Sequence, residues 1–275
     1  MTDQPGREKW ADPKSDPRSV DELISSALSE SDDGLAWDCI SALQWKGSRE
    51  VFERASGLCR SFCPVERSMG ADILGQLGVP DRSFPKSCLS VLLGLLEAER
   101  DEDVIRSILI ALSHLREPGG IEPAARFRDH ANPDIRHAVV HAMTGHEDLL
   151  AVEVLIGLSR DPDPHNRDWA CFSLGDMIEL DTPNLRNALA ERLSDEDDDT
   201  RCEALAGLAR RGDSRVVEPL LKALASESVS TLEVEAAELI ADPRLYPELL
   251  ALRGWWDVNE ALLERAILAC SPPES

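Results

Sequence analysis

Hydrophobic residues recur along most of the chain with the spacing of an amphipathic helix. Ile105, Ile108, Leu109 and Leu112 occupy positions i, i+3, i+4 and i+7 of one such segment. A stripe of this width is suited to burial on two sides, as in a helix packed between neighbours. Short polar turns rich in Asp, Asn and Pro separate the segments. Further examples are 51–59, 88–96, 147–158 and 214–224.

A motif opens every second helix in the middle of the chain. Acidic or proline residues precede an arginine, and a small or aliphatic residue follows six positions later. Successive motif arginines are 30 to 39 residues apart, and the repeating unit has a period near 31. Five occurrences in register indicate a structural repeat. The motif arginines are Arg67, Arg106, Arg136, Arg167 and Arg201.

The repeat unit reads as helix A, a short polar turn and helix B. Counting pairs from Val20 to Cys270 gives about eight. The sequence therefore predicts an all-α fold, an α-solenoid of about eight antiparallel helical hairpins over residues 19–270. Residues 1–18 are polar and proline-containing and are expected to form a disordered tail. Residues 271–275 are expected to form a C-terminal tail, because a diproline prevents the last helix from continuing.

The amino-acid composition favours a helical fold, and the net charge limits the classes of molecule that the chain can bind. Aromatic residues make up only 4% of the chain, and its net charge is −23. Such a charge repels nucleic acids and anionic membranes, and it favours encounter with basic proteins. The start of the chain has no leader pattern, and no hydrophobic run is long enough to span a membrane. We therefore expect a cytoplasmic protein that binds neither nucleic acid nor membrane.

The repeated motif resembles that of HEAT-like repeats, especially the short kind named after the phycocyanobilin lyases. The resemblance extends over roughly residues 19–270 and implies an armadillo-like superhelix. It also implies that motif arginines and turn aspartates connect neighbouring repeats as a structural ladder. The pairs implied here are Asp134 with Arg136, Asp163 with Arg167, and Asp198 or Asp199 with Arg201.

In HEAT-like repeats the B helices line the concave face, so the resemblance also suggests a binding surface. Counting from the motif arginines aligns His137 with Asp168, and His141 with Phe172, in neighbouring repeats. The resulting mixture of apolar and polar side chains is typical of a protein interface. The expected partner-binding residues are Ile110, His114, His137, Val140, His141, Asp168, Phe172 and Leu205.

Catalytic and metal-binding motifs give no firm assignment. His137, His141 and Asp168 could supply three metal ligands, but solvated or partner-facing histidines are the favoured interpretation. No phosphate loop, nucleophile elbow or zinc-ribbon spacing is present in the sequence. We therefore expect no metal, no cofactor and no catalytic residue.

Two functions follow as hypotheses. The first is a non-enzymatic scaffold or inhibitor that binds a basic protein through the concave groove and acidic edges. An immunity protein that neutralises a basic toxin or nuclease is one version of it. The alternative, implied only by the resemblance, is a bilin-lyase-like protein that attaches or chaperones a chromophore or another cofactor.

Overall fold

The computed structural model describes residues 15–273, and its regular elements there are all helical. They divide into two compact units, which comprise the described residues 15–127 and 128–273. The first unit contains α1 (Val20–Ser29), α2 (Asp33–Lys46), α3 (Arg49–Leu58), α4 (Pro64–Gly75), α5 (Pro85–Ala98), α6 (Glu102–Leu115), η2 (Pro118–Gly120) and α7 (Ile121–Ala125). The second contains α8 (Pro133–Met143), α9 (Leu149–Leu158), α10 (Pro164–Asp176), α11 (Pro183–Arg192), α12 (Asp198–Arg210), η3 (Ser214–Val216), α13 (Val217–Leu224), α14 (Thr231–Ile240), η4 (Pro243–Leu245), α15 (Tyr246–Leu252) and α16 (Glu260–Ala269).

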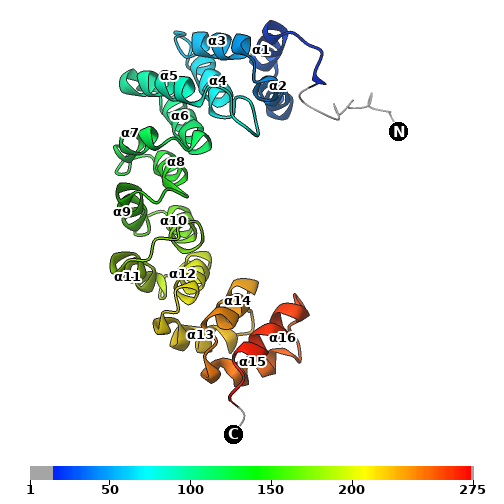
Figure 1. Cartoon of the computed structure of the whole chain (residues 1–275), viewed down its shortest axis with the longest axis vertical. Coiled ribbons are helices and arrows are strands. Elements are labelled where there is room, and N and C mark those ends of the chain that lie inside the picture. Colours follow the sequence, from blue (N-terminus) through cyan, green and yellow to red (C-terminus); the bar gives the residue numbers. More distant parts are fainter. Residues whose placement is uncertain (1–14, 274–275) are drawn as a thin grey trace, which may run out of the picture. The chain divides into compact units, whose positions relative to one another are not determined.

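The sixteen α-helices of the described residues follow one another as eight pairs along the chain, which confirms the prediction of about eight hairpins (Figure 1). Polar turn residues start the B helices. The side chains of Asn132, Asp163 and Asp197 accept hydrogen bonds from backbone N–H groups in the first turns of α8, α10 and α12. Pro133 and Pro164 follow two of these caps, where a missing N–H costs nothing.

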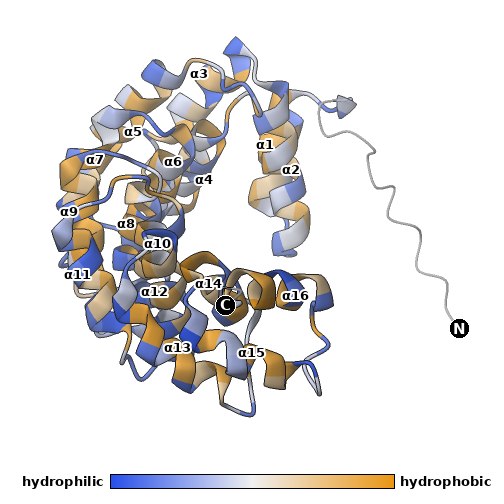
Figure 2. Cartoon of the chain, turned by 60° about the horizontal axis from the view of Figure 1, so that its bottom comes forward, coloured by the Kyte–Doolittle hydropathy of each residue, from blue (hydrophilic) through white to orange (hydrophobic). Residues whose placement is uncertain are grey.

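Within the second unit the helices form two rows. The B helices α8, α10, α12, α14 and α16 pack in sequence order, and α9 packs beside α11 and α13 beside α15 in the other row. In Figure 2 each helix carries both hydrophobic and hydrophilic residues. The hydrophobic residues form the core between the rows, where Leu155, Leu174, Leu189, Leu208 and Leu220 are fully buried.

The folded part of the chain begins earlier than the sequence predicts. Residues 15–18 lie within the described residues and belong to the first unit. Asp16 is buried, its carboxylate pairs with Arg18 at 2.7 Å, and its carbonyl accepts a 2.7 Å hydrogen bond from Lys46 on α2. The boundary at residue 18 is therefore corrected. Residues 1–14 of the predicted tail, and 274–275 of the C-terminal one, lie outside the described residues.

An arginine ladder connects successive repeats, but its carboxylates differ from those implied by the resemblance. Arg67 binds Glu99, Arg136 binds Asp161, and Arg167 binds Asp195, each through Nε and Nη2 at 2.6–3.0 Å. Each carboxylate lies in the turn before the next B helix, and the ion pairs are largely buried.

Asp134 and Asp163 were therefore wrongly assigned as ladder partners. Asp134 is exposed in the first turn of α8, and Asp163 caps α10 by accepting from the N–H of His165. A carboxylate this close to the helix start can accept hydrogen bonds from the first backbone N–H groups of its own helix. The longer arginine side chain extends towards the next repeat. Arg201 does pair with Asp198, as implied, but within α12.

Arg106 is also misassigned, for a reason of register. Arg67, Arg136, Arg167 and Arg201 each stand four residues after the N-cap of their helix, whereas Arg106 stands five after its N-cap, Asp101. One residue rotates a side chain by about 100° around the helix axis. Ile105 therefore takes the buried position, and Arg106 is exposed.

The helices α10 and α12 approach each other closely at two glycines. A Cβ added to Gly207 would lie 2.6 Å from the Cα of Gly175, which no real contact allows. Arg211, just after α12, holds the same junction by donating to the carbonyls of Gly175, Gly207, Leu174 and Ile178 at 2.7–3.0 Å. This contact brings the outer faces of α10 and α12 side by side.

Candidate protein-interaction surface

Five rings from α8 and α10 form a continuous cluster on the B-helix row of the second unit. His137 stacks on His165 with ring centroids 4.4 Å apart, and Trp169 lies 4.8 Å from His141 and 5.7 Å from Phe172. His165 is exposed and the other four rings are partly exposed. We call His137, His141, His165, Trp169 and Phe172 the aromatic cluster.

A buried asparagine fixes the orientation of the two α8 histidines. Asn166 is 1% exposed, and its amide nitrogen donates to the carbonyl of Pro133 at 3.1 Å. Its Oδ1 lies 3.0 Å from Nδ1 of His137, so that nitrogen donates. His137 Nε2 then accepts from His141 Nε2 at 3.0 Å. Burial and the nearby His165 lower the pKa of His137, which favours this neutral form.

Two carboxyl groups with altered ionisation lie on α10 and α12, and Asp168 adjoins the aromatic cluster in sequence. Asp168 precedes Trp169 on α10, and Glu203 lies on the adjacent α12; both are partly exposed. Burial, followed by repulsion from Asp199 and Asp197, raises the pKa of Asp168 to about 6. Burial, followed by repulsion from Asp168, raises the pKa of Glu203 to about 7. Burial and neighbouring carboxylates therefore disfavour the ionised forms of both Asp168 and Glu203.

The structure brings together four of the predicted partner-binding residues. His137, His141, Asp168 and Phe172 lie on the same surface of α8 and α10, as expected. Ile110 is partly exposed and His114 exposed on α6, which belongs to the first unit.

Val140 and Leu205 are corrected, because they are 0% and 4% exposed and belong to the core. Both stand eight residues after the N-cap of their helix, as does the buried Cys171 of α10. That position is buried in all three helices, whereas the position nine after the N-cap holds the partly exposed His141 in α8 and Phe172 in α10.

Sequence reasoning left His165, Trp169 and Glu203 out of the predicted site. His165, Asp168, Trp169 and Phe172 occupy positions i, i+3, i+4 and i+7 and so form one stripe on α10. Glu203 stands at the same distance from its N-cap as Trp169. Aligning whole helices by the distance of each residue from its N-cap identifies these residues, whereas aligning individual residue pairs does not.

The interpretation of His137, His141 and Asp168 as metal ligands finds no support in the geometry. Both ring nitrogens of His137 already take part in hydrogen bonds. Across residues 15–273 no three His, Cys, Asp or Glu side chains converge as metal ligands would. In the same part of the chain, every helix is too short or too polar to cross a membrane.

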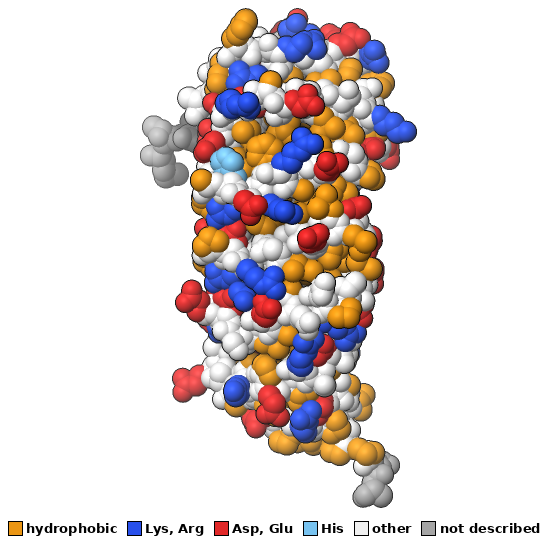
Figure 3. All heavy atoms as spheres, turned by 90° about the vertical axis from the view of Figure 1, so that its left-hand side faces the viewer, with side chains coloured by type: hydrophobic (Ala, Val, Ile, Leu, Met, Phe, Trp, Pro, Cys, Tyr) orange, Lys and Arg blue, Asp and Glu red, His pale blue; other side chains and the backbone are white. Residues whose placement is uncertain are grey.

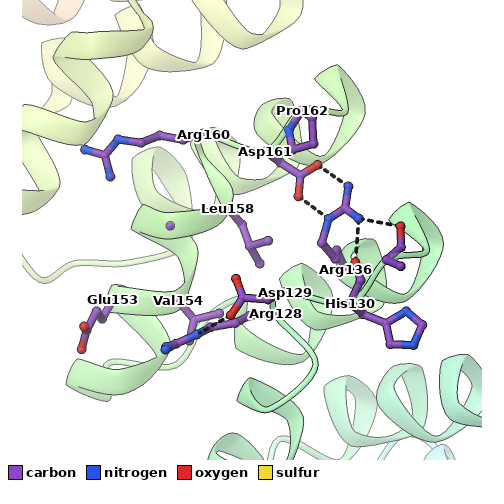
Figure 4. A pocket seen from close by; sticks show the side chains of 12 residues that line it. Arg128, Asp129, His130, Arg136, Glu153, Val154, Leu158, Arg160, Asp161 and Pro162 are labelled. Carbon is purple, nitrogen blue, oxygen red and sulfur yellow. Dashed lines mark hydrogen bonds and ion pairs between the residues drawn. The ribbon is translucent and has the colours of Figure 1, made fainter.

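A separate pocket of about 570 Å³ lies in the second unit, where the ladder pair Arg136–Asp161 forms part of its lining. Three arginines line it, and each has a carboxylate partner. Figure 4 shows Arg136 paired with Asp161 at 2.6 Å and Arg128 paired with Asp129 at 3.5 Å. Arg160 pairs with Glu191 at 2.7 Å. The face in Figure 3 likewise intersperses cationic, anionic and hydrophobic side chains. Internal pairing of these charges makes the pocket a weaker candidate than the aromatic cluster.

Comparisons with known proteins agree with the repeat architecture. Residues 151–241 match the sequence pattern of HEAT repeats, a range that includes α10 and α12. Protein YibA of Escherichia coli K12 is 27% identical over 230 residues, which cover 80% of each chain. The X-ray structure of Escherichia coli YibA superposes with a TM-score of 0.79 at 21% identity, over 98% of this chain and 99% of that one.

A second solved structure, of an engineered protein, matches at a TM-score of 0.58 and 16% identity over 91% of this chain and 77% of that one. At such identities the likeness concerns the fold. Together with the repeated helix pairs, these similarities support an all-α repeat fold in which residues 151–241 match HEAT repeats.

Proposed function

We propose that the chain is a non-enzymatic interaction scaffold that binds a basic protein through the B-helix surface of its second unit. The observation that carries this proposal is the aromatic cluster, whose five rings remain partly or fully exposed beside Asp168 and Glu203. The few residues that supply most of the binding energy in protein interfaces are enriched in tryptophan, and Trp169 contacts the other four rings of the cluster.

Rigidity supports the same proposal. The Asn166 hydrogen bonds fix His137, the Gly175–Gly207 contact fixes α10 against α12, and the ladder fixes successive repeats. A surface that is already ordered loses little conformational entropy when a partner binds. The net charge of −23 favours a basic partner, both in encounter and in the complex. Inhibition of a basic toxin or nuclease is one role that such binding would serve.

Site-specific photo-crosslinking in cells that express the chain tests this function. Benzoylphenylalanine placed at Phe172 probes the B-helix surface, and the same group placed at the exposed Glu153 of α9 is the matched control. We expect a discrete product with one basic protein from position 172 alone. That protein, once purified, should bind the chain in solution. An equal product from position 153, or none from 172, would contradict the proposal.

A further inference from the structure

We propose that the surface formed by Trp169, Phe172, Asp168 and Glu203 receives a guanidinium group, that is, an arginine side chain of the partner. This inference rests on the proposed function and specifies the chemical group recognised by the same surface. It follows from three observations: the order of side chains on α10, the position of Glu203 on α12, and the charge that surrounds both carboxylates.

The first observation is the combination of rings and carboxylate on one helix. Phe172 stands four residues after Asp168 and three after Trp169, so both side chains are its neighbours on one face of α10. The rings of Trp169 and Phe172 meet edge to face at 79°. A flat indole with a carboxylate at its side suits a planar cation, which stacks on the ring and donates hydrogen bonds in its own plane.

The second observation is the carboxylate on the adjacent helix. Glu203 stands at the position of α12 that corresponds to Trp169 on α10, and the Gly175–Gly207 contact leaves little space between the two helices. Asp168 is near enough to Glu203 to raise the pKa of the Glu203 carboxyl. A guanidinium has five N–H donors in a rigid fork and can serve two carboxylates from different helices, whereas an ammonium offers a compact point charge.

The third observation is the local excess of negative charge. Asp199 and Asp197 repel Asp168. Around Glu203, Asp168, Asp176 and Asp199 repel, and Arg210 attracts. Arg210 is itself engaged by Asp176 at 2.8 Å. A cation from a partner would relieve this repulsion, so the surface and an arginine are complementary in charge as well as shape.

The test titrates the full chain with the blocked peptide acetyl-Gly-Arg-Gly-amide. The probe is the ¹⁵N–¹H signal of the Trp169 indole, assigned by its loss in Trp169→Phe. Matched peptides carry citrulline, which keeps the planar shape without charge, or lysine, which keeps the charge without the plane. We expect a saturable shift with the arginine peptide, and binding at least about fivefold weaker for each of the other two.

Neutralised variants complete the test. Asp168→Asn with Glu203→Gln should weaken arginine binding at least about fivefold, whereas Glu153→Gln with Glu218→Gln removes equal charge from α9 and α13 and should have little effect. Circular dichroism verifies that both variants fold. Equal binding of the citrulline or lysine peptide, no saturable shift, or an unaffected Asp168/Glu203 variant would overturn the assignment. A crosslinked basic partner would in those cases leave the proposed function intact.

Discussion

The buried ladder pair of Arg136 and Asp161 should contribute strongly to stability. The Arg136 side chain is 11% exposed and that of Asp161 is 2% exposed, and Arg136 also donates to the carbonyls of His130 and Ala131. Arg136→Ala would leave the Asp161 carboxylate buried without its cation. We expect a loss of about 3 kcal/mol in the free energy of unfolding, measured by urea denaturation.

Arg160→Ala is the matched control for this prediction. Arg160 and Glu191 form an ion pair of similar length, 2.7 Å against 2.6 Å, but their side chains are 45% and 48% exposed. Because water screens this pair, we expect a loss of at most about 1 kcal/mol. Equal losses of unfolding free energy for the two variants would show that burial does not increase the contribution of the ladder pair to stability.

The carboxyl pair beside Trp169 should reduce stability at neutral pH. The folded-state pKa values of Asp168 and Glu203 are about 6 and about 7, above the ordinary values of 3.8 and 4.5. The folded chain therefore binds more protons than the unfolded chain between about pH 4 and 7, and these groups lower stability as the pH rises through that range. Asp168→Asn with Glu203→Gln should raise the stability at pH 8 by about 1–2 kcal/mol, allowing for solvent screening.

Thermal unfolding at pH 8 and pH 4 measures this effect. The gain should vanish by pH 4, where the native carboxyl groups are already protonated. A gain that persists unchanged at pH 4 would mean that the substitutions act through packing and not through charge. A gain at pH 8 alone would agree with a surface that gives up stability for binding.

At the scale of secondary-structure elements, the crossing of α10 and α12 depends on Gly175 and Gly207. A methyl group on Gly207 would meet Gly175 Cα at 2.6 Å and force the helices apart. We expect Gly207→Ala to lower stability by about 1–3 kcal/mol in urea denaturation. Gly157 on α9 has no atom within 4 Å of an added Cβ, so Gly157→Ala should be neutral or stabilising by up to about 1 kcal/mol. Equal effects of the two substitutions would contradict the close crossing.

Helix spacing could be predicted from the sequence because it is a local property. Hydrophobic residues at i, i+3, i+4 and i+7 and the caps Asn132, Asp163 and Asp197 specify where the helices begin and which face is buried. The exceptions came from one-residue differences in register. Arg106 is displaced by one position from the other ladder arginines, and Val140 by one from His141, which changes an exposed face into a buried one or the reverse.

The ladder carboxylates and the full site could not be predicted in the same way, because both depend on packing between repeats. The partners of Arg67, Arg136 and Arg167 lie 32, 25 and 28 residues further along, so no fixed spacing identifies them. The contact of His165 with His137, and the position of Glu203 beside the α10 stripe, likewise depend on how adjacent B helices pack.

At the scale of the whole molecule, the net charge of −23 should govern the rate of association with a basic partner. Long-range attraction is screened by salt, whereas contacts at the aromatic cluster are not. Raising the ionic strength from about 0.05 to 0.5 M should slow association at least about tenfold and change dissociation much less. Stopped-flow mixing measures both rates, and a salt-independent association rate would argue against a basic partner.

The most direct test of the central claim compares two tryptophans in binding to the crosslinked partner. Trp169 lies in the aromatic cluster, whereas Trp255 follows α15 and is 49% exposed. Isothermal titration calorimetry should show that Trp169→Ala weakens binding at least about 30-fold, or about 2 kcal/mol, and that Trp255→Ala changes it by less than about threefold. Equal losses, or a loss confined to Trp255→Ala, would contradict the assignment of the B-helix surface as the binding site.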